Sequence, residues 1–279
     1  MASARSGYLV GLVGSGIGTS LTPHLHEREA DTLGIRYLYR LLDLRTLGPE
    51  RVGDVVAAAQ LAGYDGLNVT HPVKQLVLPH LDQLSPDAAS VGAVNTVVFT
   101  DTGSVGHNTD LTGFAQALAT GLPGAAIETV VLLGAGGAGA AIAHALSSLG
   151  VHTLHIADVD HDRAGRLADR IPAAKAVRLD EPGLLDDANG LVHATPTGMA
   201  GHPGLPLPAT ALRPDLWVAD VVYRPLETEL LTTARTRGCR VLDGGRMAVF
   251  QAAGTFRIIT GREPDTDRML RHFDEIAGR

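Results

Sequence analysis

Residues 129–139 read TVVLLGAGGAG, an apolar run followed directly by a glycine-rich turn. The apolar run predicts a buried strand, and the alanine-rich stretch after the turn predicts a helix that ends at Gly150. Gly134, Gly136 and Gly139 have the spacing G-x-G-x-x-G between that strand and that helix. The alternative is a plain strand-turn-helix with convenient glycines, but the context favours a dinucleotide-binding unit.

The three glycines have separate physical roles in such a unit. The first permits a tight turn, the second lets the backbone approach a pyrophosphate, and the third lets the helix pack closely on the strand. The start of the helix adds free N–H groups and a positive dipole end, which favour phosphate. We therefore expect the cofactor to contact the residues of this loop, namely Gly134, Ala135, Gly136, Gly137, Ala138 and Gly139.

An acidic residue follows the next expected strand, which covers residues 151–157. Asp158 stands about 20 positions after the last glycine of the motif. A carboxylate there accepts hydrogen bonds from ribose hydroxyls and repels a 2′-phosphate, which predicts NAD rather than NADP. Arg163, a little further along, either stacks on adenine or faces solvent, and the sequence leaves both readings open.

Outward from this motif, the chain alternates between strand and helix patterns, with a domain boundary expected near a helix over 111–122. The alternation predicts an α/β protein with a mainly parallel sheet covered on both faces. On the N-terminal side we expect strands over 8–13, 37–43 and 66–70 and helices over 23–33, with Thr22 as N-cap, and 52–62. On the C-terminal side we expect strands over 190–194, 217–222 and 239–242 and helices over 163–170, 227–237, 247–260 and 265–276.

Composition limits the class of protein. Of 279 residues, 45% are hydrophobic and 33 are glycine, so a folded core is expected. A net charge of −7 argues against a nucleic-acid binder. The single Cys239 excludes an internal disulfide, and the histidines show no compact spacing that would predict a metal. The chain has no evident signal segment or long apolar run, which predicts a cytoplasmic protein without membrane contact.

Several further motifs follow one another along the chain. They are SLTP over 20–23, NVTHPVK over 68–74, GAVNT over 92–96, GHNTD over 106–110, DGGRM over 243–247 and QAA over 251–253. In these motifs and their order, from about residue 8 to residue 275, the chain resembles the shikimate dehydrogenase family. Several motifs in one order are far more specific than any one of them.

The resemblance implies two α/β domains. An N-terminal substrate domain would cover 1–111, with C-terminal helices over 245–279 returning to it, and a Rossmann-type NAD-binding domain would cover 112–244. It implies reversible hydride transfer at the C3 hydroxyl of a small-molecule substrate, quinate or shikimate, or their dehydro forms. The oligomeric state stays open, with a homodimer among the alternatives.

Lys74 and Asp110 match the catalytic pair of the family. Oxidation of an alcohol needs a base for the hydroxyl proton, and the reverse reaction needs an acid for the ketone oxygen. The family match implies that Lys74 fills both roles and that the carboxylate of Asp110 orients it. Without the family match, Lys74 would be an exposed lysine after a proline turn and Asp110 a helix N-cap.

Ser20 and Thr22 match the paired hydroxyls that hold the substrate carboxylate in the family. Biosynthetic shikimate dehydrogenases usually have serine at both positions. The pattern Ser-x-Thr-Pro, together with the acid at Asp158, is similar to the NAD-linked quinate/shikimate dehydrogenase branch.

The resemblance assigns the remaining contacts to neutral polar groups, which suit a polyhydroxylated ring. Near the nicotinamide it places Thr195 and Met247, and the His193 that precedes this stretch departs from the asparagine often found there. Substrate contacts are expected from Asn68, Thr70, Asn95, Tyr223 and Gln251.

Three alternatives stay open at this stage. The first is a biosynthetic shikimate dehydrogenase that uses NADP. The second is a paralogue that acts on aminated analogues of shikimate. The third is a catalytically silent, ligand-sensing relative, against which the intact Lys74 and Asp110 argue.

Overall fold

The computed structural model describes residues 7–279, which divide into two compact units. Of the described residues, unit 1 comprises 7–109 and Val249–Arg279, and unit 2 comprises Asp110–Ala248. The second boundary between the units falls inside the long helix α8 (Gly244–Thr260). Within the described range, no helix combines the length and the apolar character that a membrane span requires.

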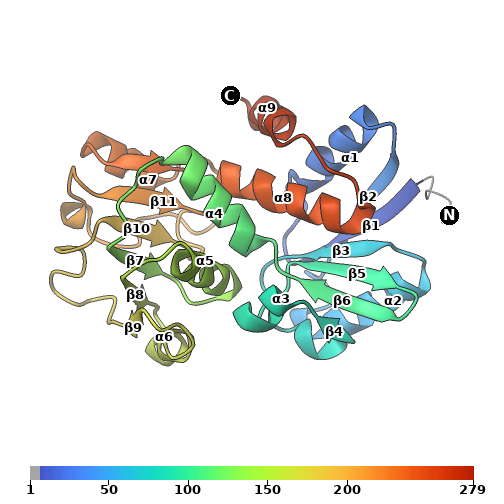
Figure 1. Ribbon diagram of the computed structural model, residues 1–279, viewed down its shortest axis with the longest axis horizontal. Coiled ribbons are helices and arrows are strands. Elements are labelled where there is room, and N and C mark those ends of the chain that lie inside the picture. Colours follow the sequence, from blue (N-terminus) through green and yellow to red (C-terminus); the bar gives the residue numbers. More distant parts are fainter. Residues whose placement is uncertain (1–6) are drawn as a thin grey trace. The chain divides into compact units, whose positions relative to one another are not determined.

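The sheet of unit 1 is mixed (Figure 1). Its strand order is β2-β1-β3-β5-β6-β4. The first three strands are parallel, but β5 is antiparallel to both β3 and β6. The bounds are β1 (Gly7–Gly14), β2 (Arg36–Asp43), β3 (Gly66–Val69), β4 (Gln83–Leu84), β5 (Thr96–Thr100) and β6 (Gly103–His107).

The expectation of a mainly parallel sheet is confirmed for unit 1, because among its described strands β5 alone runs against the others. Strands β5 and β6 are joined by residues 101–102 alone. A connection of two residues can only join antiparallel neighbours, because a parallel pair needs a crossover of a dozen residues or more. The helix α3 still precedes β5, so the alternation of helix and strand is broken only between β5 and β6, which form a hairpin.

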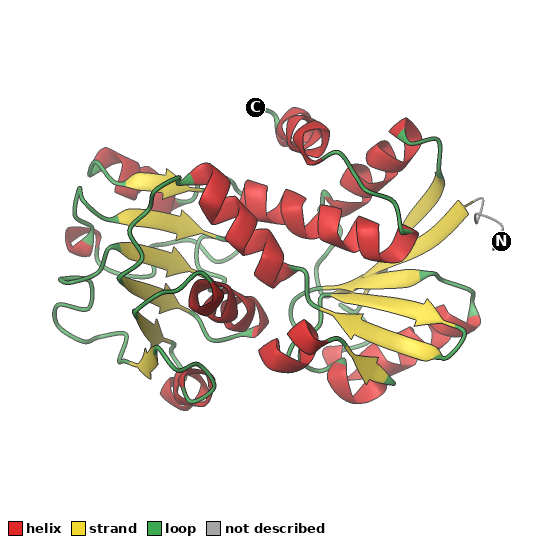
Figure 2. Ribbon diagram, in the orientation of Figure 1, coloured by secondary structure: helices red, strands yellow, loops and turns green. Residues whose placement is uncertain are grey.

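The helices of unit 1 flank this sheet (Figure 2). Thr22 is not the N-cap of the first helix. That position belongs to Leu21, and no side chain caps it, while the Ser20 hydroxyl accepts the N–H of Thr22 at 3.3 Å. The bounds are α1 (Thr22–Thr32), α2 (Val52–Leu61), α3 (Pro86–Val91) and α9 (Thr266–Ala277), with short 3-10 turns η1 (Pro49–Arg51) and η2 (Leu78–His80).

Unit 2 has an all-parallel sheet of order β12-β11-β10-β7-β8-β9. When the strands are numbered 1 to 6 along the chain and the sheet is read from β9, this is the strand order 3-2-1-4-5-6 of a dinucleotide-binding fold. The order confirms the expected fold class. Its strands are β7 (Thr129–Leu133), β8 (Thr153–Ala157), β9 (Ala174–Ala176), β10 (Gly190–His193), β11 (Trp217–Asp220) and β12 (Arg240–Leu242). Its helices are α4 (Asp110–Gly121), α5 (Gly137–Ser148), α6 (His161–Ala168) and α7 (Glu229–Thr236), with the 3-10 turn η3 (Ala209–Ala211).

Each unit has its own hydrophobic core. In unit 1, Val13, Leu67 and Val97 of three neighbouring strands are buried against Val56 of α2. In unit 2 the core extends from Val131 on the central strand β7 through β10 to the helix α7. It includes Leu191, Val218 and Leu231. Each of these two clusters lies within a single unit.

Candidate active site

In unit 1 the site begins where two parallel neighbours end. Strand β1 ends at Gly14 and β3 at Val69, so the segments after them leave from the same edge of the sheet. The two segments touch, because Ser15 donates its N–H to the carbonyl of His71 at 3.1 Å. A Cβ added at Gly14 would lie 2.5 Å from Cγ2 of Thr70. Glycine is thus required there for Thr70 to lie against the end of β1.

The Ser20 and Thr22 hydroxyls lie side by side. The Oγ of Ser20 donates to Oγ1 of Thr22 at 3.1 Å, and both side chains are partly exposed. The loop that leads to them is held by Asp43 at the end of β2, whose carboxylate accepts the N–H groups of Gly16 at 3.0 Å and Ile17 at 3.3 Å. Although desolvation by itself raises the pKa of Asp43, hydrogen bonds from backbone N–H groups outweigh it and lower that pKa.

Asn68 is held in one orientation inside unit 1. Its Oδ1 accepts the hydroxyl of Tyr39 at 2.7 Å. Its Nδ2 donates to the carbonyl of Asn95 and to Oγ1 of Thr255, both at 3.2 Å. Only 4% of Asn68 is exposed, so the amide could offer a substrate one remaining lone pair of Oδ1 and no free N–H.

Asn95 belongs to the same network. Its Nδ2 donates to Oγ1 of Thr109 at 2.8 Å and, more weakly, to Oε1 of Gln251 at 3.5 Å, while its Oδ1 accepts the N–H of Thr109 at 2.9 Å. Thr109 Oγ1 in turn donates to the carbonyl of Gln251 at 3.0 Å. The α8 residues of unit 1 are therefore tied to the segment that follows β6.

Lys74 and Asp110 fall in different units. Lys74 is half-buried in the turn that follows a cis peptide bond between His71 and Pro72, and its carbonyl accepts the N–H of Val94 at 2.8 Å. Asp110 is the first residue of α4 and is 4% exposed. The helix thus includes Asp110, where an N-cap was the alternative.

In unit 2 the glycine loop follows β7. Gly134 has φ +104°, a conformation that favours glycine, and a Cβ there would lie 2.7 Å from the carbonyl oxygen of Ala194. A Cβ added at Gly139 would lie 2.0 Å from the carbonyl oxygen of Gly134. A Cβ added at Gly136 would have no atom within 4 Å. The backbone at Gly136, just before α5, therefore faces open space, as a pyrophosphate site requires.

The carboxylate of Asp158 lies against this loop. Its Oδ2 accepts the N–H of Ala135 at 2.7 Å, and its Oδ1 accepts the N–H of Asp160 and an N–H of Arg163, both at 2.9 Å. Arg163 thus does more than face solvent, although its side chain is 41% exposed. Val159, next to Asp158, is 89% exposed, which is unusual for an aliphatic side chain.

The other expected residues of unit 2 lie at ends of elements. Thr195 comes just after β10 and accepts the N–H of Thr197 at 3.3 Å. Tyr223 follows β11 and is partly exposed, and Met247 is buried in the first turns of α8. All three come from the carboxyl side of the parallel sheet or the helix that follows it, where ligands of such sheets bind.

Comparison with known proteins agrees with this architecture. Residues 12–97 match the family model described as "Shikimate dehydrogenase substrate binding domain". The chain is 60% identical to the shikimate dehydrogenase (NADP(+)) of Streptomyces avermitilis, over 98% of this chain and 97% of that protein. It is 48% identical to the quinate/shikimate dehydrogenase (NAD(+)) of Corynebacterium glutamicum, over 95% of this chain and 97% of that protein.

The chain belongs to the shikimate dehydrogenase family. A solved structure of quinate dehydrogenase from Corynebacterium glutamicum in complex with NAD has a TM-score of 0.89 and 45% identity, covering 97% of this chain and all (100%) of that one. The two-domain α/β fold of the family and its oxidoreductase class therefore hold for this chain. Relatives with NAD and with NADP in their names both occur, so the family alone does not decide the cofactor.

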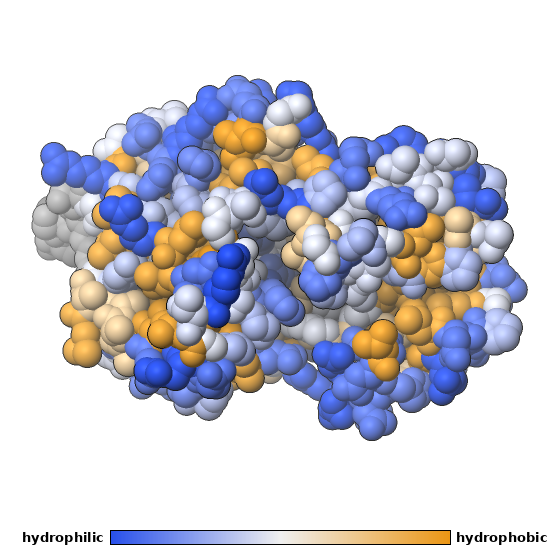
Figure 3. Space-filling model, turned by 180° about the vertical axis from the view of Figure 1, so that it is seen from behind, coloured by the Kyte–Doolittle hydropathy of each residue, from blue (hydrophilic) through white to orange (hydrophobic). Residues whose placement is uncertain are grey.

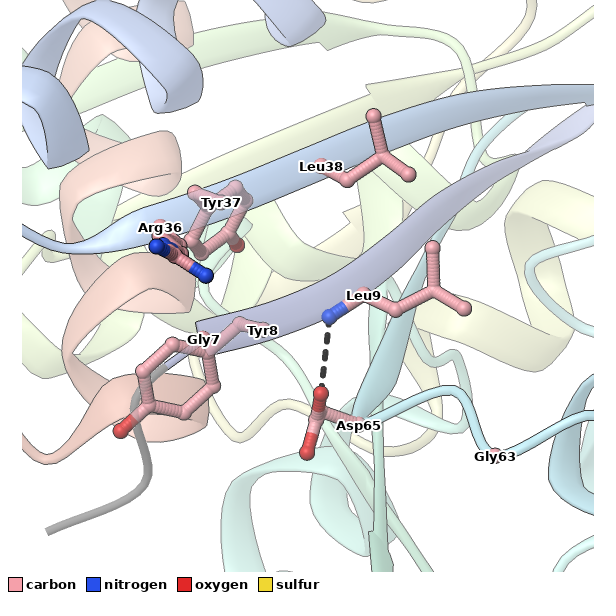
Figure 4. A pocket seen from close by; sticks show the side chains of 8 residues that line it. All are labelled: Gly7, Tyr8, Leu9, Arg36, Tyr37, Leu38, Gly63 and Asp65. Atoms are coloured by element: carbon pink, nitrogen blue, oxygen red, sulfur yellow. Dashed lines mark hydrogen bonds between the residues drawn. The ribbon is translucent and has the colours of Figure 1, made fainter.

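A hollow of about 460 Å³ in this shikimate dehydrogenase family member lies away from these residues. It is lined by the first residues of β1 and β2 and by the turn before β3, where Asp65 accepts the N–H of Leu9 at 2.8 Å (Figure 4). These are the amino ends of parallel strands, whereas ligands of such sheets bind beyond the carboxyl ends. None of the residues expected at the site lines it.

Motif reasoning missed several residues of these networks. Tyr39 and Thr255 contact Asn68, and Thr255 stands four positions after Gln251 on α8. That i, i+4 spacing is a signal that could have found Thr255, since it puts both residues on one helix face. Across residues 7–279, no group of three or more His, Cys, Asp or Glu residues has the arrangement of a metal site.

Proposed function

We propose that this protein is an NAD-dependent dehydrogenase that oxidises the C3 hydroxyl of quinate or shikimate, and reduces the corresponding ketones. The observation that carries the choice of NAD is the position of Asp158 at the end of β8, with its carboxylate on the N–H of Ala135. A negative charge at this point favours a ribose with free hydroxyls over one that bears a phosphate.

The hydroxyls and amides of unit 1 suit a hydroxylated ring with a carboxylate. Ser20 and Thr22, whose hydroxyl oxygens lie 3.1 Å apart, would both donate to the carboxylate once the Ser20 hydroxyl turns away from Thr22. Thr70, Asn95 and Gln251 would contact ring hydroxyls, and the network behind Asn68 would keep its remaining acceptor fixed. A site of fixed neutral groups rejects analogues that lack a hydroxyl, because its buried polar groups are then left unpaired.

Lys74 and Asp110 would manage the proton. When bound, the nicotinamide ring takes or gives the hydride. The amine of Lys74 takes the proton from the C3 hydroxyl in oxidation and returns it to the ketone oxygen in reduction. The carboxylate of Asp110 would orient Lys74, as a buried acid beside a cationic group can.

In unit 2 the cofactor would lie along the glycine loop and the end of β8. The open backbone at Gly136 supports a pyrophosphate there, and the first N–H groups of α5 add favourable dipoles. Val159 offers an exposed apolar surface to adenine beside the ribose-binding carboxylate. Thr195 and Met247 would contact the nicotinamide, and Tyr223 the substrate carboxylate.

The second candidate is an NADP-dependent shikimate dehydrogenase. Two observations favour it: the name of the relative from Streptomyces avermitilis and the guanidinium of Arg163 beside Asp158, which could pair with a 2′-phosphate. Steady-state kinetics with quinate and shikimate, each with NAD and NADP, separates the candidates. Turnover of shikimate with NADP alone would overturn our proposal.

The Asp158→Asn variant tests the physical reason for the cofactor choice. We expect it to raise kcat/KM with NADP relative to NAD by about 10-fold or more, because a charge repulsion of roughly 1.4 kcal/mol or more is removed. Asp160→Asn is the matched control, since this neighbouring carboxylate caps α6 instead of contacting the glycine loop. An unchanged NADP/NAD ratio in Asp158→Asn would contradict the role of Asp158.

A further inference from the structure

Two buried residues at the ends of β10 and β11, His193 and Asp220, play no part in the function proposed so far. His193 is the last residue of β10, and its side chain is fully buried. Its Nδ1 lies 2.9 Å from Oδ1 of Asp220, and its Nε2 lies 2.5 Å from Oγ1 of Thr195. The imidazole therefore bridges a buried carboxylate and a hydroxyl.

The sheet register creates the first of these contacts. His193 on β10 pairs with Asp220 on β11 in the parallel ladder. Asp220 is fixed by further bonds, because its Oδ1 accepts the N–H of Val222 at 3.0 Å and its Oδ2 accepts the hydroxyl of Thr228 at 2.7 Å. The carboxylate is thus a rigid acceptor on one side of the imidazole.

The proton positions follow from the donor and acceptor types. A carboxylate only accepts, so Nδ1 of His193 carries a proton and donates it to Asp220. In the neutral ring Nε2 is then an acceptor, and it takes the hydroxyl proton of Thr195. The Oγ1 of Thr195 also accepts the N–H of Thr197 at 3.3 Å. What Thr195 has left to offer a ligand is a lone pair.

Thr195 lies beside the dinucleotide loop. A Cβ added at Gly134 would be 3.1 Å from Cγ2 of Thr195 and 2.7 Å from the carbonyl oxygen of Ala194. Thr195 itself is partly exposed, unlike the buried His193. The fixed hydroxyl is therefore the end of the network that a ligand in the loop can reach.

We propose that His193 and Asp220 are positioning residues that fix the hydroxyl of Thr195 as a hydrogen-bond acceptor for the carboxamide N–H of the nicotinamide. The inference rests on the proposed function, since it assumes a nicotinamide near Thr195. An asparagine at position 193 could pair with Asp220 but is too short to reach Thr195 as well. The two nitrogens of the imidazole ring, Nδ1 and Nε2, contact both partners at once.

Binding measurements with three ligands test the proposal. NADH carries the carboxamide, 3-acetylpyridine adenine dinucleotide has an acetyl group without N–H in its place, and ADP-ribose has no pyridine ring. We expect His193→Asn and Thr195→Val to weaken the binding of NADH by about 10-fold, which is the contribution of one hydrogen bond. The affinities for the other two ligands should stay within about 2-fold of those of the unaltered chain. The double variant should be no weaker than Thr195→Val, since His193 acts through Thr195.

Controls keep the proposal falsifiable. His155→Asn changes a partly buried histidine of the neighbouring strand β8 and should leave all three affinities unchanged. If His193→Asn does not fold, Thr195→Ser, which keeps the hydroxyl, should bind NADH as the unaltered chain does while Thr195→Val does not. Equal weakening of all three ligands, or additive losses in the double variant, would overturn the proposal. If the chain uses NADP instead, NADPH serves as the probe. Failure of the proposed cofactor choice is then distinguishable from failure of the role proposed for His193.

Discussion

Replacing Lys74 by alanine tests the proton transfer that we propose for its amine. We expect kcat to fall by about 100-fold or more, the usual contribution of a general acid or base, while substrate affinity changes less. Steady-state rates in both directions measure this. Lys175→Ala is the control, because Lys175 is exposed on β9. A near-normal kcat in Lys74→Ala would remove Lys74 from the mechanism.

A second residue, His26 of α1, makes the stability of the protein depend on pH. It is fully buried against aromatic rings, with Tyr39 at a centroid distance of 5.2 Å and Phe256 at 6.0 Å, and Nδ1 lies 3.1 Å from the hydroxyl of Tyr37. Desolvation by burial lowers the pKa of His26 from 6.5 to about 3. The folded protein therefore holds this imidazole neutral where the unfolded chain would protonate it.

The sign of the pH effect follows from this lowered pKa. Between pH 6.5 and pH 3 the unfolded chain binds a proton that the folded protein does not, so the free energy of unfolding falls as pH falls. At pH 5 the loss from this residue is about 2 kcal/mol, and below pH 3 it no longer grows. We expect urea denaturation of His26→Gln to depend less on pH over this range. His24→Gln, at an exposed position of the same helix, should keep the dependence of the unaltered chain, and an equal slope in both variants would contradict the prediction.

Sequence reasoning at the residue scale succeeds where a contact is local. The neighbouring hydroxyls of Ser20 and Thr22 lie two positions apart, and they do meet. Thr255, in contrast, contacts Asn68 over a separation of 187 residues. The i, i+4 spacing from Gln251 places Thr255 on a face of α8, but it does not identify Asn68 as the partner, because that contact depends on how α8 packs inside unit 1. The link from His193 to Asp220 is missed for the same reason, as it depends on strand register.

At the scale of elements, the turn between β7 and α5 allows a paired test of two glycines. We expect Gly139→Ala to destabilise the protein by about 1–3 kcal/mol, because the new Cβ would clash with the carbonyl of Gly134. Gly136→Ala should leave stability nearly unchanged, since its φ of −76° suits alanine and the Cβ meets no atom within 4 Å. The Gly136→Ala variant should instead bind NAD about 10-fold or more weakly, because the methyl group takes the space of the pyrophosphate.

Urea denaturation and NAD titration measure the two effects separately. Gly165→Ala in α6 is the control, as its Cβ also meets nothing within 4 Å and it lies inside a helix. It should stabilise the protein by about 0.5–1 kcal/mol without a change in NAD affinity. A Gly136→Ala variant with normal NAD affinity would show that the cofactor does not approach this backbone.

The helices α1 and α9 are joined by two ion pairs of different burial. Glu29 is fully buried and accepts Nε of Arg268 at 2.9 Å and Nη2 at 2.5 Å, while Arg28 and Glu275 pair at 2.6 Å with 44% and 57% of their side chains exposed. We expect Arg268→Ala to cost about 3 kcal/mol, since it leaves a buried carboxylate with less compensation. Arg28→Ala should cost less than about 1 kcal/mol.

Thermal or urea denaturation of the two variants measures this difference. Glu29 also accepts the N–H of Asp265 at 2.9 Å, which leaves it one partner in Arg268→Ala. Equal costs in Arg268→Ala and Arg28→Ala would contradict the argument from burial. A double variant Glu29→Gln, Arg268→Ala should recover part of the loss, because the unpaired charge is then gone.

Elements with one clear period are predictable from the sequence, and those without one are not. The strand β7 lies where its apolar run ends in glycine, and α5 begins at Gly137, one residue before the start at Ala138 that the alanine-rich stretch predicts. The hairpin of β5 and β6 is not predicted by this alternation, because its two short strands have no helix between them. The three-residue strand β9 has no periodic signal of its own, since it forms only by pairing with β8.

On the scale of the whole molecule, the net charge has the same sign as the ligands that we propose. The net charge is −7, yet the proposed cofactor and substrate are both anions. On the face shown in Figure 3, hydrophobic residues occur in several separate groups among hydrophilic ones. We therefore expect long-range attraction to contribute little and binding to depend on local donors such as the Ser20 hydroxyl and the N–H groups at the start of α5.

The division into two units predicts how ligands change local stability. The core around Val131 lies wholly in unit 2, and the core around Val13 lies wholly in unit 1. At 100 times its Kd, a ligand stabilises the unit that binds it by about 2.7 kcal/mol, which slows exchange from fully unfolded states by about 100-fold. We expect NAD to slow amide exchange in β7 and β10 and to leave β1 and β3 nearly unchanged. Shikimate should do the reverse.

Hydrogen exchange followed by mass spectrometry measures both patterns on the full chain. Gly136→Ala is the control, since at the same NAD concentration it should lose most of the protection of β7 while shikimate still protects β1. Equal protection of all four strands by NAD alone would mean that the two units unfold as one, whatever their separate cores suggest. Protection confined to the strands of one unit would instead show that each core is a cooperative unit, and that each ligand stabilises only the sheet whose loops bind it.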